Sequence, residues 1–185
     1  VGRIGNLGKG ERIYAVRFLN DLATVVTFRQ TDPLYTIDLS QPEQPRLLGE
    51  LKILGYSAYL HPVGNSLLLG VGQDALETGQ TTGTQVSLFD ISDLSQPKRV
   101  DQWQLRGASS EVEFNARAFL HWNAENLFVL PLATHRIDDA TSEPFVGAVA
   151  LELNDNKLGE RGRITHLKKP PKVNCDTWFE DTEDE

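Results

Sequence analysis

The chain has 185 residues, 39% of them apolar, and a formal net charge of −8 at pH 7. Six acidic residues lie between positions 176 and 185; the rest of the chain has 20 acidic against 18 basic side chains, which excludes a basic surface for nucleic acid. No run approaches the roughly 18 apolar residues of a membrane helix, so we expect no membrane span in this chain.

A single cysteine, Cys175, excludes an intrachain disulfide and a cysteine-rich zinc site. The chain starts at Val1 and contains no Met, so we expect an internal or processed piece. It carries no secretion signal, and any such signal would lie outside it. Residues 168–185 are predicted to form a solvated acidic tail, with a docking role as the alternative.

A unit of four short apolar runs repeats along the chain. The first runs contain the tetrapeptides Arg17-Phe18-Leu19-Asn20, Ala58-Tyr59-Leu60-His61 and Ala118-Phe119-Leu120-His121. The second runs cover 23–28, 67–71 and 127–132; the third 34–39, 86–91 and 146–153; the fourth 46–53, 98–105 and 158–166. All are rich in β-branched and aromatic residues and none shows a 3.6-residue period, so each predicts a β-strand.

A Ser- and Pro-rich turn follows the third run in the first two units. Asp-Leu-Ser at 38–40 recurs as Asp-Ile-Ser at 90–92; a Pro-x-x-Pro segment (42–45) follows the first, and Pro97 follows the second at the place of Pro45. An Asp before a turn can accept backbone N–H groups, so we expect Asp38 and Asp90 to form Asx-turns. Their repetition indicates a structural role.

Four antiparallel strands with a period of 40–60 residues are typical of a β-propeller blade, and the predicted class is all-β. A β-sandwich also has short, evenly spaced strands and is the alternative, although it leaves the recurring turn unexplained. The predicted divisions are an outer strand at 1–7 and blades at 12–53, 56–105 and 114–167. Three blades and one strand are too few for a closed ring, so we expect completion by more of the same protein or by another copy.

Third strands that end in Asp–apolar–Ser before Pro-x-x-Pro resemble the LVIVD-type propeller repeat, itself distantly similar to WD repeats. More closely, GERIYAVRF, VVTFRQTDPLYTIDLSQPEQPRLLGELKILGYSAYLHP and SLFDIS resemble a family of secreted bacterial and archaeal proteins with a C-terminal β-propeller domain. The similarity covers roughly residues 8–132. It implies a secreted, periplasmic or cell-surface propeller of uncharacterised role, and it transfers no catalytic residue.

Several short motifs suggest chemistry but lack its structural context. Residues 70–75 (GVGQDA) fit a dinucleotide-binding pattern, yet no helix is predicted after them. Ser57 lacks the second Gly of a nucleophile elbow, and Lys9 lacks the remainder of a phosphate loop. His61 and His121 occupy equivalent repeat positions, which favours hydrogen bonding within the fold over a metal site. We therefore predict no catalytic residue, no metal ligand and no cofactor; a bound calcium ion is compatible with the sequence but not indicated by it.

Loops that differ between blades are the predicted binding site. In a meander the connections between second and third strands share one end of the blade with the connections between blades. These connections are long and unlike one another at 73–85, 106–113 and 134–144. The predicted binding face consists of Arg29, Asp32, Gln73, Asp74, Glu77, His135, Arg136, Asp138 and Asp139.

The sequence thus predicts a non-enzymatic propeller module that binds a protein, peptide or glycan outside the cytoplasm. One alternative is a hydrolase or metal-dependent enzyme with its site on the same loop face, since propellers of different function share one fold. The other is an architectural domain that packs against another region of its own protein.

Overall fold

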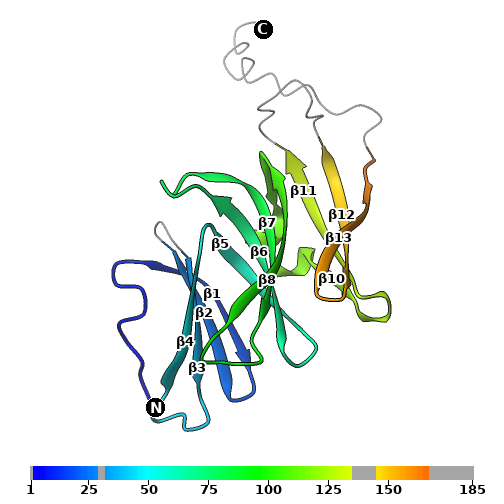
Figure 1. Ribbon diagram of the computed structural model, residues 1–185. Helices are drawn as coiled ribbons and strands as arrows, with labels where there is room; N and C mark the ends of the chain where they lie inside the picture. Colours follow the sequence, from blue (N-terminus) through cyan, green and yellow to red (C-terminus); the bar gives the residue numbers. More distant parts are fainter. Residues whose placement is uncertain (1, 29–31, 135–144, 167–185) are drawn as a thin grey trace, which may run out of the picture.

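Three antiparallel sheets of four strands each form the described part of the chain, and the strands of each sheet follow chain order. A computed structural model describes residues 2–28, 32–134 and 145–166, with only the backbone at Asp32. Figure 1 shows the sheets one after another, from blue through green to orange, without closing into a ring. The predicted all-β fold of four-stranded antiparallel blades is confirmed.

The first blade contains β1 (Arg12–Leu19), β2 (Leu22–Phe28), β3 (Asp32–Asp38) and β4 (Arg46–Ile53). The second contains β5 (Tyr56–Val63), β6 (Leu67–Ala75), β7 (Thr81–Asp90) and β8 (Lys98–Arg106). The third contains β10 (Leu120–Trp122), β11 (Leu127–Thr134), β12 (Val146–Asn154) and β13 (Lys157–Ile164), with the additional strand β9 (Ala108–Ser110).

The first strand of blade 3 is split in two. β11 pairs with β9 at its end and with β10 at its beginning, and two 3-10 turns, η1 (Glu111–Glu113) and η2 (Ala116–Ala118), separate the two short strands. The prediction of a loop over 106–113 was therefore wrong, because Ala108–Ser110 hydrogen-bonds into the sheet. The third sheet begins at Ala108, six residues before the predicted blade boundary at 114.

Residues 2–7 form no strand, although an outer strand over 1–7 was predicted. A fourth strand pairs with the third strand of its own blade. For residues 1–7 that third strand is not among the residues of this chain, so they have no strand to pair with. Instead, Gly2 N donates to Pro42 O (3.0 Å), and Ile4 and Leu7 pack on the apolar face of blade 1 that is turned away from blade 2.

The turns between third and fourth strands, Ser–Pro turns in blades 1 and 2, lie at the same end of each blade as the turns between first and second strands. The residue after Asp38, Asp90 or Glu152 donates its backbone N–H to the turn between the first and second strands of its blade. These hydrogen bonds run from Leu39 to Asp21 (2.7 Å), from Ile91 to Ser66 (2.8 Å) and from Leu153 to Asn126 (3.1 Å). Asp38 and Asp90 accept the N–H of Ser40 and Ser92, each at 2.8 Å, so both predicted Asx-turns are confirmed. The described connections at 54–55, 76–80 and 107 lie at the opposite end.

Apolar side chains between neighbouring sheets make the core. The residues between blades 1 and 2 include Val26, Leu34, Leu68 and Phe89; those between blades 2 and 3 include Leu69, Leu88, Phe128 and Leu151. β6 is buried along almost its whole length because a blade covers each face of its sheet. This explains why its sequence is nearly continuously apolar instead of alternating.

Polar contacts add to this packing between blades. Thr36 Oγ1 of β3 donates to Leu94 O in the turn of blade 2 (2.5 Å), and Asp101 Oδ2 of β8 accepts Leu158 N of β13 (2.7 Å). A Cβ on Gly49 would lie 2.4 Å from Leu94 O, so the approach of the two blades requires glycine there.

Replacing Asp90 by Ala is expected to lower the thermal midpoint by a few degrees, since the loss of one such hydrogen bond costs about 1 kcal/mol. The Ser92 hydroxyl and N–H lower the pKa of Asp90, so this contribution is present above the ordinary carboxyl pKa and is lost as pH falls below it. Asp90→Asn, which keeps an acceptor oxygen, should lower the thermal midpoint less than Asp90→Ala does. Thermal unfolding measures the midpoints of both Asp90 variants, with Glu43→Ala as a control at an exposed position. Equal midpoints for Asp90→Ala and Asp90→Asn would contradict the assignment of an Asx-turn.

Candidate functional site

A pocket of about 610 Å³ lies at the end of blade 2 that is opposite the Ser–Pro turns. It is bounded by the start of β5, the end of β6, the start of β7, the end of β8 and the β9–η1 segment of blade 3. The lining residues are Tyr56, Gln73, Leu76, Gln80, Thr81, Thr82, Gly83, Arg106, Gly107, Ala108, Ser109 and Glu113. The pocket therefore belongs to two blades.

Backbone hydrogen bonds fix the rim of this pocket. The turn between β6 and β7 is closed by Leu76 N to Gln80 O (2.9 Å) and Gly79 N to Leu76 O (2.8 Å). On the facing side, Gly107 N donates to Thr82 O (2.9 Å). Gly107 has a φ of 64°, a conformation that permits the sharp passage from blade 2 to blade 3 without the cost of a side chain.

The carboxylate of Glu113 organises the floor of the pocket. One oxygen accepts Gln73 Nε2 (2.6 Å) and the backbone N–H of Ser110 (3.0 Å), and the other accepts the Tyr56 hydroxyl (3.3 Å). The Ser110 hydroxyl caps η1 in return, which makes a capping box of Ser110 and Glu113. Glu113 thereby joins β5 and β6 of blade 2 to the first segment of blade 3.

Tyr56 is held at the pocket by a group of aromatic rings between blades 1 and 2. Its ring centroid lies 4.5 Å from that of Tyr14 and 5.0 Å from that of Phe28. Burial, followed by the negative charge of Glu113, raises the pKa of Tyr56. The phenol consequently stays protonated and donates to Glu113.

The rim of the pocket carries side chains that face solvent. Arg106 and Gln80 are exposed, and neither side chain makes a hydrogen bond or ion pair within residues 2–28, 32–134 and 145–166. Thr82 Oγ1 donates to Asp74 Oδ2 (2.7 Å), which fixes that carboxylate beside the rim. The lining itself has one cationic and one anionic side chain, Arg106 and Glu113.

The predicted binding face meets this pocket at one residue. Gln73 lines it with a buried side chain, Asp74 lies beside it, and Glu77 is exposed on the turn of its rim. Five predicted residues, Arg29, His135, Arg136, Asp138 and Asp139, lie outside the described residues, and Asp32 is described only by its backbone. Their membership of a common face stays a prediction.

Sequence reasoning missed Tyr56, Arg106 and Glu113. Residues 106–113 were interpreted as a variable loop, so a carboxylate at a fixed place in the fold was not considered. The available signal was Ser110-Glu111-Val112-Glu113, which fits the Ser-x-x-Glu capping box and predicts a helical turn that aims Glu113 back at its start.

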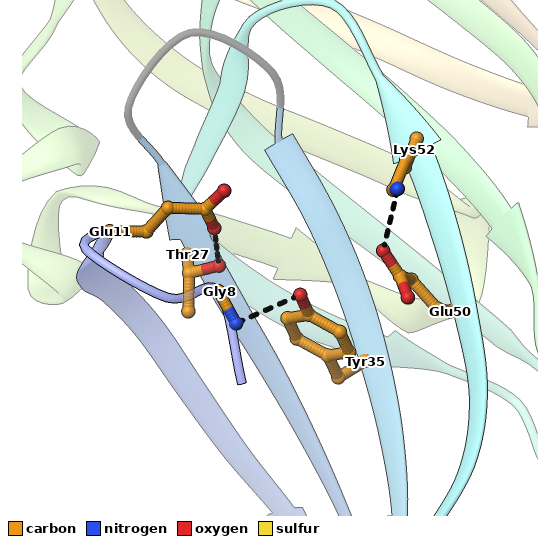
Figure 2. Close-up of polar contacts among 6 residues, drawn as sticks. All are labelled: Gly8, Glu11, Thr27, Tyr35, Glu50 and Lys52. Atoms are coloured by element: carbon orange, nitrogen blue, oxygen red, sulfur yellow. Dashed lines mark hydrogen bonds and ion pairs between the residues drawn. The ribbon is translucent and has the colours of Figure 1, made fainter. Parts of the chain in front are cut away.

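A smaller hollow of about 370 Å³ lies on blade 1, between the N-terminal segment and strands β3 and β4. Figure 2 shows its polar contacts: Gly8 N donates to the Tyr35 hydroxyl (3.1 Å), Thr27 donates to Glu11, and Lys52 pairs with Glu50 (3.4 Å). Burial, with the charge of Glu50 adding to it, raises the pKa of Tyr35. These contacts hold residues 8–11 against the sheet, so we interpret the hollow as part of the N-terminal packing.

Two histidines from neighbouring blades meet at the first strands. His61 Nε2 of β5 lies 2.9 Å from His121 Nδ1 of β10, and the Tyr59 hydroxyl lies 3.1 Å from His61 Nδ1. Burial, followed by the charges of His121 and Arg17, lowers the pKa of His61 to about 4, and burial lowers that of His121. Within the described segments no group of three or more His, Cys, Asp or Glu side chains lies close enough to hold a metal ion.

Acidification is expected to destabilise this contact between blades. In the folded chain the pKa of His61 lies below the ordinary histidine value of 6.5, so its contribution to stability is complete above pH 6.5 and is lost as pH falls towards 4. His61→Asn, which places the residue found at the equivalent position 20, should flatten the dependence of the thermal midpoint on pH between 7 and 4. His166→Asn, at an exposed histidine, is the control; an unchanged slope in His61→Asn would contradict the assignment.

Comparison with known proteins agrees with the three-blade geometry. A family model described as a beta propeller domain matches residues 1–185. The chain belongs to the beta propeller domain family. This settles the choice between propeller and sandwich that the sequence left open.

The beta propeller chain is similar to two archaeal proteins of uncharacterised function. It is 44% identical to one from Methanocaldococcus jannaschii over 158 residues, which cover 85% of this chain and 23% of that protein. It is 49% identical to one from Archaeoglobus fulgidus over 131 residues, which cover 71% of this chain and 20% of that protein. The chain thus spans about a fifth of the length of the curated relatives that it matches. No helix in the described residues is long and apolar enough to cross a membrane.

Proposed function

We propose that this propeller segment is a non-enzymatic binding module, and that the pocket bounded by Tyr56, Gln80, Arg106 and Glu113 takes its ligand. The observation that supports it is a concave site with hydrogen-bonding groups, placed where the blades stop repeating. Resemblance to secreted propeller proteins supports a location outside the cytoplasm. The ligand classes proposed are those a propeller loop face can accommodate: a protein segment, a peptide or a glycan.

The state of Glu113 supports binding over catalysis. Its two oxygens already accept hydrogen bonds from Gln73, Ser110 and Tyr56. A carboxylate engaged in this way orders the pocket floor, whereas a general acid or base must reach a proton of the substrate. Arg106 and Gln80, which are exposed at the rim, are the side chains ready to meet a ligand.

Blocking the pocket should abolish binding. Gln80→Trp places an indole at the mouth on an exposed turn, and Gln41→Trp makes the same change at the opposite end of the neighbouring blade. A mixed set of saccharides and short peptides, screened by ligand-observed NMR, should give binders that are lost with Gln80→Trp and kept with Gln41→Trp. If no compound binds, or if binding survives Gln80→Trp, this pocket is not the ligand site.

A second, architectural role is supported by two open apolar faces. On the side of blade 1 turned away from blade 2, β1 exposes Ile13, Val16 and Phe18, the last at 68% of its full area. On the side of blade 3 turned away from blade 2, β10 exposes Leu120 and Trp122, the latter at 55%. We propose that these faces pack against further four-stranded blades of the same, longer polypeptide, because the chain corresponds to only about a fifth of its relatives.

The isolated chain is therefore expected to self-associate as its concentration rises, since paired apolar sheet faces are a strong driving force for assembly. Phe18→Ser with Trp122→Ser should reduce association, measured by light scattering, while circular dichroism stays unchanged. A longer polypeptide that includes adjoining blades should be monomeric at the same concentration. Monomeric behaviour of the isolated chain at all concentrations would contradict this role.

A further inference from the structure

We infer that the pocket at the boundary of blades 2 and 3 takes a short neutral saccharide of one or two rings, an inference that rests on the proposed binding function. Six of its lining residues have uncharged hydrogen-bonding side chains: Tyr56, Gln73, Gln80, Thr81, Thr82 and Ser109. Tyr56 and Gln73 already donate to Glu113 and Thr82 to Asp74, so these three offer acceptor oxygens to a ligand. Hydroxyl and amide groups both donate and accept. Such a set matches a ligand whose own groups are hydroxyls.

The charges at the pocket argue against an anionic ligand. Arg106 and Glu113 are its two ionic side chains, and they are of opposite sign. Asp74 stands just behind Thr82 and adds a negative charge beside the rim. An anion would therefore gain from one guanidinium and lose to two carboxylates, whereas a neutral polyhydroxyl ligand can accept hydrogen bonds from Arg106 without that repulsion.

The strand pairing argues against a peptide bound as an added strand. Such peptides need a free sheet edge. β6 and β7 are paired on both sides, so the edge strands of this sheet are β5 and β8. Each of these two lines the pocket with one residue, Tyr56 or Arg106, so a strand added along either edge would meet the pocket only at its end. β9 is only three residues long, and Gln73 Nε2 already donates to Ala108 O (3.4 Å).

Size and apolar surface agree with a sugar ring. The volume of about 610 Å³ falls within the range of small-molecule pockets. Leu76, half exposed at the rim, gives apolar surface for the C–H face of a ring. Tyr56 is held by Tyr14 and Phe28, so this wall is already ordered before a ligand arrives.

The test uses maltose, cellobiose, lactose and trehalose as neutral probes, glucuronate and glucosamine as charged ones, and tri- and tetrapeptides as the other class. Affinities are measured by calorimetry and saturation-transfer NMR. At least one neutral saccharide should bind, and Gln80→Ala with Thr81→Val should weaken it about tenfold or more, as expected for two lost hydrogen bonds. Gln41→Ala should leave its affinity unchanged.

The outcomes separate this inference from the binding function itself. Pocket-dependent binding of a charged saccharide or a peptide, without any neutral saccharide, would overturn the ligand class and leave the binding function in place. Absence of binding by every probe, or binding that the double substitution does not change, would overturn both.

Discussion

The structure depends on the packing of one sheet face on the next. Each blade has two apolar faces, and four strands cannot bury them alone. Blade 2 is covered on both sides, so β6 and β7 are buried over most of their length. Blades 1 and 3 each have one such neighbour, and the N-terminal segment with Ile4 and Leu7 lies on the outer face of blade 1. The contacts between blades therefore hold the fold together more than any single sheet does.

The candidate site arises where the third blade departs from the repeat. An uninterrupted first strand would pass straight along β11, as β5 passes along β6. The interruption between β9 and β10 makes room for η1, and η1 brings Glu113 to Gln73 and Tyr56 of blade 2. The candidate site thus depends on a short insertion of irregular structure at one blade boundary.

Local sequence predicted much of this fold because local chemistry determines it. The apolar runs, and the Asp38 and Asp90 turns, are set by side chains acting within a few residues. The pocket could not be predicted in the same way, since Tyr56 and Glu113 are 57 residues apart and meet only through the packing of two blades. The strand predicted at 1–7 failed for a related reason: its pairing partner is not determined by those residues. Family resemblance gave the architecture but no site.

The position of the pocket between two blades couples ligand binding to the arrangement of the blades. Each blade touches only its neighbours, so stability is a sum of blade terms and boundary terms. A ligand that contacts Thr81 on blade 2 and Ser109 on blade 3 would stabilise the boundary between these two blades and no other. Binding of such a ligand would raise the free energy needed to detach blade 3 from blade 2. It would therefore slow backbone amide hydrogen exchange in β9–β13 more than in β1–β4. The stability of the contact between blades 2 and 3 would then report whether the pocket is occupied.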